Sequence, residues 1–167
     1  MREKLEPLAG QRLRFRGVFS KYGVKSSYKG LPRLTLILVD VEHGGVVVTD
    51  HLWFNWTKGF QGLGLLCPGD VVAFDARVET YWKGYLGDEH DVQEKDYHLT
   101  RQTRLKVVML AESRDPELYQ VCAVCGFPND QRAETCRRCR TRLSMDYPVK
   151  TVERSMKKRL EQMKLVE

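Results

Sequence analysis

The sequence lacks the features that identify several common classes of protein. Its apolar runs all fall short of the roughly 20 residues that a membrane-spanning helix needs. The N-terminal segment, MREKLEPLAGQRLRFRG, has no apolar stretch typical of a secretory signal. The phosphate-binding motif GxxxxGKS/T, the metalloprotease motif HExxH and a recognisable Ser-His-Asp arrangement are also missing. These absences predict a non-enzymatic protein that does not cross a membrane and resides in the cytoplasm or with the nucleoid.

Carboxylates capable of two-metal nuclease chemistry are present, but their placement argues against that use. Asp40 and Glu42 share one face of a predicted strand, whereas Asp50 and Asp75 lie on two other strands. Two-metal catalysis requires carboxylates that converge on one point. The sequence therefore favours a binding protein over a nuclease.

Positive charge is concentrated in two segments of the chain. Residues 1–36 hold nine Lys or Arg against two Glu, and residues 132–164 hold eleven Lys or Arg against four acids. Two basic segments indicate a polyanionic partner, most often nucleic acid, although a solvated surface is an equally reasonable interpretation. The stretch DEHDVQEKD (88–96) is acidic, and we expect an exposed loop there that could contact a basic protein partner.

Hydrophobic periodicity between residues 11 and 110 is typical of β-strands. We expect five strands, at 11–19, 33–41, 45–56, 70–82 and 99–110, with a short helix or compact connector at 57–66. This order resembles the OB-fold, a five-stranded Greek-key barrel with a connector between its third and fourth strands. The predicted fold is mainly β, with an OB-like barrel at 1–110; an SH3-like barrel and an open sandwich are the alternatives.

The third predicted strand ends in HLWFNW, which places large aromatic residues on both faces of one strand. If Leu52, Phe54 and Trp56 point inward, His51 and Trp53 point outward; the opposite register exposes Phe54 and Trp56. Either register leaves an aromatic ring outside the barrel, where the OB-fold has its ligand groove. An exposed ring there can stack on an unpaired base, although packing beneath a C-terminal helix is an alternative role for Trp53.

Two predicted loops combine aromatic rings with cations. Residues 20–33 form the first loop, and the second begins with TYWKGY after the fourth strand, where Trp82 continues the inward set and is expected in the core. This layout resembles single-stranded-DNA-binding OB-fold proteins, including the replication protein A class. The resemblance implies binding of single-stranded DNA, with RNA as second choice, and a place in DNA replication. The candidate nucleic-acid-binding residues are Lys21, Tyr22, Lys25, Tyr28, Lys29, Arg33, His51, Trp53, Tyr81, Lys83, Tyr85, Arg137 and Arg138.

Four of the five cysteines are packed into CAVCGFPNDQRAETCRRC, with the spacing C-x2-C-x10-C-x2-C. Each C-x2-C pair supplies two thiolates from one tight turn, and four thiolates form a closed structural zinc site. The pattern around Cys122, Cys125, Cys136 and Cys139 resembles the zinc ribbon, which implies one structural Zn²⁺; free thiols and a redox pair are weaker alternatives. The remaining cysteine, Cys67, is expected to be a buried or loop thiol.

The rest of the chain completes the predicted organisation. Residues 111–120 form a linker, 121–143 the zinc ribbon, and 144–167 a basic amphipathic helix that could contact a protein partner. Some proteins that pair a zinc ribbon with an OB-fold serve as adaptors for acyl ligands or partner enzymes. Their ribbon usually precedes the barrel, whereas here it follows. An adaptor role is therefore the alternative to nucleic-acid binding.

Overall fold

The computed structural model describes residues 2–25, 32–83, 94–113 and 115–143. The chain divides into two compact units. The sheet unit comprises Met1–Lys21 and Thr35–Arg114, and the cysteine unit comprises Tyr22–Leu34 and Asp115–Glu167. The predicted C-terminal helix, most of the acidic loop, and Tyr28, Lys29 and Tyr85 lie outside the described residues.

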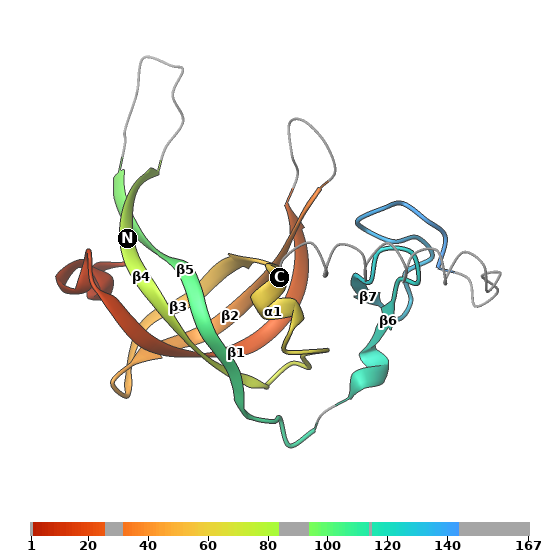
Figure 1. Cartoon of the computed structure of the whole chain (residues 1–167), viewed down its shortest axis with the longest axis horizontal. Helices are drawn as coiled ribbons and strands as arrows, with labels where there is room; N and C mark the ends of the chain where they lie inside the picture. Colours follow the sequence, from red (N-terminus) through yellow and green to blue (C-terminus); the bar gives the residue numbers. More distant parts are fainter. Residues whose placement is uncertain (1, 26–31, 84–93, 114, 144–167) are drawn as a thin grey trace, which may run out of the picture. The chain divides into compact units, whose positions relative to one another are not determined.

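The main element is a strongly curved five-stranded sheet (Figure 1). Its strands are β1 (Arg12–Lys25), β2 (Arg33–His43), β3 (Val46–Asn55), β4 (Val71–Lys83) and β5 (Glu94–Met109). They follow the order β3-β2-β1-β4-β5, with antiparallel pairing of β1 with β4, β2 with β3 and β4 with β5. The mainly β prediction is confirmed. Because β3 and β5 stand at the two ends of this order, the described strands do not close into a hydrogen-bonded barrel.

Short elements complete the two units. The 3-10 helix η1 (Glu3–Leu8) precedes β1, and the single-turn helix α1 (Lys58–Gln61) connects β3 to β4 where the sequence predicted a connector. The cysteine unit contains η2 (Pro116–Leu118) and a two-stranded sheet of β6 (Tyr119–Val121) and β7 (Pro128–Asp130). No helix in the described ranges is long and apolar enough to span a membrane.

One face of the five-stranded sheet carries the core. The rings of Phe15 and Phe74 lie 6.0 Å apart, and Phe54 lies 5.3 Å from Phe74 and 5.7 Å from Phe60 of α1. The side chains predicted to point inward from the fourth strand are buried, namely those of Val72, Phe74, Ala76 and Val78. Strand alternation therefore predicts the core residues of β4 correctly, whereas β2 is buried without alternation from Leu34 to Leu38.

Two strands are longer than predicted, and this corrects the first predicted loop. The strand predicted to end at residue 19 continues to Lys25, and β2 begins at Arg33. Lys21, Tyr22 and Lys25 therefore lie in a strand rather than in a loop. Lysine, serine and glycine favour a loop in isolation, but pairing with a neighbouring strand overrides local propensity. In the same way β5 begins at Glu94, within the predicted acidic loop.

A polar network holds the N-terminus against the start of β5. The carboxylate of Asp96 accepts hydrogen bonds from the guanidinium of Arg2 at 2.8 Å, from the backbone N–H of Arg2 at 3.0 Å and from the hydroxyl of Tyr81 at 3.0 Å. Burial alone would raise the pKa of Asp96, but these hydrogen bonds, that of the Tyr97 backbone and the charge of Arg2 outweigh burial and lower it. The ionised form of Asp96 therefore stabilises the fold.

Replacing Asp96 tests this network through its pH dependence. The folded-state pKa lies below the unfolded value of about 3.9, so the ionised carboxylate stabilises the fold above that pH and loses its effect as pH falls through the folded pKa. We expect Asp96→Asn to lower the free energy of unfolding by about 2 kcal/mol at pH 7. The variant should also lose less stability than the parent below about pH 4. Urea unfolding at pH 7, 4 and 3 measures both effects. If the parent and Asp96→Asn lose the same free energy of unfolding between pH 7 and pH 3, the assigned role of Asp96 is contradicted.

Candidate metal centre and exposed aromatic surface

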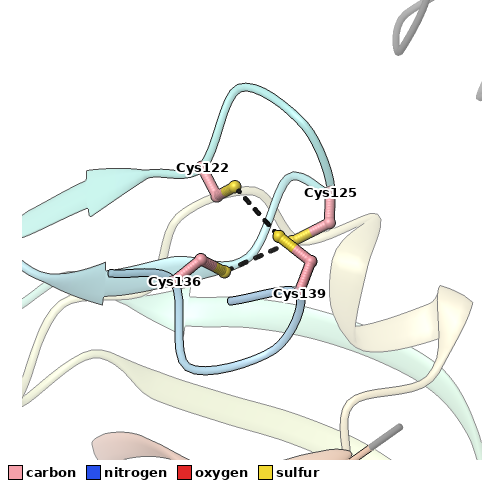
Figure 2. A group of neighbouring side chains, drawn as sticks. All are labelled: Cys122, Cys125, Cys136 and Cys139. Carbon is pink, nitrogen blue, oxygen red and sulfur yellow. Dashed lines mark hydrogen bonds between the residues drawn. The ribbon is translucent and has the colours of Figure 1, made fainter. Parts of the chain in front are cut away.

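The four clustered cysteines converge on one point (Figure 2). Their sulfur atoms all lie within 4.8 Å of one another. The Sγ atoms of Cys122 and Cys139 are 3.7 Å apart, and those of Cys125 and Cys136 are 3.5 Å apart. A tetrahedral site with metal–sulfur bonds of about 2.3 Å has sulfur–sulfur edges of about 3.8 Å. The four thiols therefore have the geometry to hold one metal ion.

Two similar turns build this centre. The N–H of Gly126 donates to the carbonyl of Cys122 at 2.8 Å, and the N–H of Arg140 donates to that of Cys136 at 3.0 Å. Both residues directly follow the second cysteine of a pair, and both have left-handed backbone conformations, with φ of 69° and 63°. The tight turn predicted for each C-x2-C pair is confirmed. Arg140 adopts the same conformation without the freedom of glycine.

The thiols have unequal proton affinities. Burial raises the pKa of Cys122 and of Cys125. Burial would also raise the pKa of Cys139, but hydrogen bonds from Thr141 and from neighbouring thiols outweigh it and lower the pKa to about 7. A bound metal ion would displace the protons that remain on these thiols, because cysteine binds a metal as the thiolate.

Asn129 supports the metal centre from inside the fold. It is buried, and its side-chain N–H donates to the carbonyl of Phe127 at 2.8 Å and to Sγ of Cys136 at 3.6 Å. Its side-chain oxygen accepts the backbone N–H of Arg137 at 2.9 Å. An N–H donor to a ligating sulfur orients that ligand and stabilises its negative charge.

We expect Asn129→Ala to weaken metal binding by about tenfold or more, because it removes the donor to Cys136 and two backbone partners. Competition with a chromophoric chelator measures the affinity. Gln131→Ala, at an exposed position nearby in the sequence, is the control and should bind metal as the parent does. Equal affinities for the two variants would contradict a supporting role for Asn129.

The register of β3 shows which aromatic residues of HLWFNW (51–56) lie outside the core. Leu52 and Phe54 are buried, whereas His51, Trp53 and Asn55 are exposed. The ring of Trp53 thus stands on the outer face with 53% of its surface exposed. The first of the two predicted registers is confirmed. His51 beside it forms an ion-pair contact of 2.9 Å with Asp50, and this hydrogen bonding lowers the pKa of Asp50.

The predicted role of Trp82 in the core is wrong. Its side chain is 66% exposed, although it continues the alternating inward set of β4. The core ends earlier on this strand, since Thr80 on the same face is already exposed. Trp82 pairs across the sheet with Lys95 of β5, so a ring and a cation face solvent together. The polar residue Thr80 was the sign in the sequence that the core ends before Trp82.

Two predicted stacking residues are occupied by other contacts. Tyr22 is buried within the cysteine unit, where its ring lies edge-on to Tyr119 at 5.4 Å and to Phe127 at 6.3 Å. Tyr81 stacks on His98 at 4.9 Å, and its hydroxyl donates to Asp96. Tyr22 is thus part of the core of the cysteine unit, and one face of Tyr81 is taken by His98.

The predicted cations are divided between the two units. Lys21 and Lys83 are exposed in the sheet unit, while the exposed Lys25 and Arg33 belong to the cysteine unit. In the cysteine unit, Arg137 is exposed and Arg138 donates to the carbonyl of Cys125 at 3.3 Å. Cys67 is buried, as expected, and its N–H donates to Asp70 at 2.9 Å.

The sequence reasoning missed a group of cations on the sheet unit. Arg104 and Lys106 of β5 lie beside Arg12 and Arg14 of β1 in one groove. The sequence TRQTR (100–104) contains a sign of this grouping. Its two arginines, Arg101 and Arg104, stand three positions apart, which breaks the alternation of a regular strand.

Comparison with known proteins adds no family to these observations. No protein-family model matches the chain, and no curated protein or solved structure shows significant similarity to it. The function must therefore be argued from the residues themselves.

Proposed function

We propose that the chain binds single-stranded nucleic acid, DNA in preference to RNA, through exposed aromatic rings on a partly open OB-like barrel. The observation that carries the proposal is the exposed ring of Trp53 near the end of β3, between the buried Leu52 and Phe54. An unpaired base can stack on such a ring. The exposed Trp82 with Lys95 opposite it supplies a second ring next to a cation.

The sheet order supports the OB-like interpretation. The first strand has β2 on one side and β4 on the other, and α1 precedes β4. A five-stranded, partly open barrel of the OB type has this arrangement of neighbours and binds its ligand on the outer face of its second and third strands. Trp53 belongs to the third strand.

We propose that the metal of the cysteine centre is one zinc ion with a structural role. Four soft thiolates at tetrahedral spacing suit zinc, and four protein ligands leave no position open for a substrate. The proposed role of the metal is to hold the short β6–β7 hairpin and its two turns.

Fluorescence anisotropy with labelled single-stranded DNA, duplex DNA and single-stranded RNA of equal length, each at two salt concentrations, tests the nucleic-acid proposal. We expect tighter binding of single strands, with part of the affinity retained at high salt because stacking is insensitive to ionic strength. Equal and wholly salt-sensitive binding of all three ligands would reject stacking. Absence of binding would favour the adaptor role.

A further inference from the structure

A groove of about 970 Å³ on the sheet unit has a lining rich in cations. Two arginines of β1, Arg12 and Arg14, form one side, and Arg104 and Lys106 of β5 form the other. Among the described residues, Asp75 of β4 is the only carboxylate that lines it. Four cations and one acid therefore share one concave surface, and no aromatic ring lines it.

The backbone of β5 is distorted where it meets the groove. Arg101 and Arg104 have left-handed conformations, with φ of 51° and 50°, and the pairing of β4 with β5 shifts register on both sides of Asp75. Such bulges turn side chains away from regular alternation, so that Thr103 and Arg104 are both exposed. Left-handed backbone is unfavourable for arginine, and conformations of this kind cluster at functional sites.

Hydrogen bonds orient the arginines before any ligand arrives. Arg14 donates to the carboxylate of Asp75 at 3.0 Å and to the carbonyl of Arg104 at 2.9 Å. Arg12 donates to the carbonyl of Arg101 at 3.2 Å and to the hydroxyl of Thr103. The guanidinium of Arg104 lies 3.5 Å from Asp75 and is 82% exposed. A single carboxylate thus anchors two arginines while leaving the groove with an excess of positive charge.

We propose that this groove binds the phosphodiester backbone of nucleic acid, as a contact separate from the proposed stacking surface at Trp53. Oriented guanidinium groups match the geometry of phosphate oxygens. Arg16 and Arg101 extend the row of exposed cations on the same two strands, each 3.9 Å from a carboxylate, of Glu42 and Glu79 respectively. A row of this length suits a ligand with repeated charges better than a single phosphate ion. Among the described residues no ring lines the groove, so it offers no stacking surface to a base. The phosphates that it would contact are present in single strands and in duplex DNA alike, so we expect it to bind both.

Binding of single-stranded and duplex DNA by groove variants of the full chain tests the proposal. We expect Lys106→Gln to weaken both by about fivefold near 0.1 M salt and to lower the slope of log K against log salt by about one. Lys58→Gln, the same change at an exposed lysine of α1 outside the groove, should leave both unchanged. Arg104→Gly should weaken binding in the same way while raising the melting temperature, because glycine relieves the left-handed backbone.

The results separate this proposal from the stacking proposal. Trp53→Ala should affect single strands alone, whereas groove variants should affect both ligands by the same factor. If Lys106→Gln and Arg104→Gly match Lys58→Gln in affinity and salt slope, the groove does not bind phosphate. A loss confined to single strands would overturn the proposal as well.

Discussion

Removal of the metal from the four-cysteine centre is expected to unfold residues 115–143 and to leave the five-stranded sheet folded. The cysteine unit has strands of only three residues each in β6 and β7, and its buried side chains are few. Metal binding to such a module contributes on the order of 10 kcal/mol or more to its folding. The sheet unit has its own phenylalanine core and needs no metal.

Metal content and amide exchange measure this outcome. We expect one zinc ion per chain in the parent and in Cys67→Ala, which changes the buried thiol of the sheet unit. Cys136→Ser should retain little or no metal, and amides of residues 115–143 should lose protection while those of β1 to β4 in the sheet unit keep it. Full metal content in Cys136→Ser, or unchanged protection after chelation, would contradict a structural metal centre.

Truncation of Trp53 is expected to give the largest effect on binding. The ring is more than half exposed, so its loss costs the fold little, whereas stacking on one base is worth about 1–3 kcal/mol. We expect Trp53→Ala to weaken single-stranded DNA binding by about tenfold and to leave the urea midpoint nearly unchanged. Duplex binding should not change, because paired bases present no free face to the ring.

Val47→Ala provides the matched control for this measurement. Val47 is also exposed on β3, at a position that alternates with the buried Val48, but it offers no ring to a base. Anisotropy titrations at one salt concentration should therefore show a loss for Trp53→Ala alone. Equal affinities of the two variants for single strands would remove Trp53 from the proposed site.

Features that depend on local chemistry were predictable from the sequence. The ligand set of the metal centre follows from the spacing of Cys122, Cys125, Cys136 and Cys139, because each pair forms its own turn. Strand alternation predicted that a large aromatic ring of HLWFNW lies outside the core, but it left two registers open, and the burial of Phe54 in the structure shows that Trp53 is the exposed ring.

Features that depend on partner strands were not predictable in this way. The extension of β1 to Lys25 and the burial of Tyr22 require contacts with residues distant in the sequence. The exposure of Trp82 depends on where the core ends along β4, which alternation alone does not specify. The left-handed conformation of Arg104 is set by the register of β4 against β5, so the basic groove appears only in the folded chain.

The fluorescence of Trp53 can report stacking of a base on this ring. The chain has three tryptophans, so Trp56→Phe with Trp82→Phe leaves Trp53 as the one tryptophan reporter. Titration of this variant with unlabelled single-stranded and duplex DNA follows the environment of the ring itself. Stacking predicts strong quenching by single strands and little change with duplex at equal occupancy. Binding of single strands that leaves the emission of Trp53 unchanged would contradict the claim that this ring holds a base.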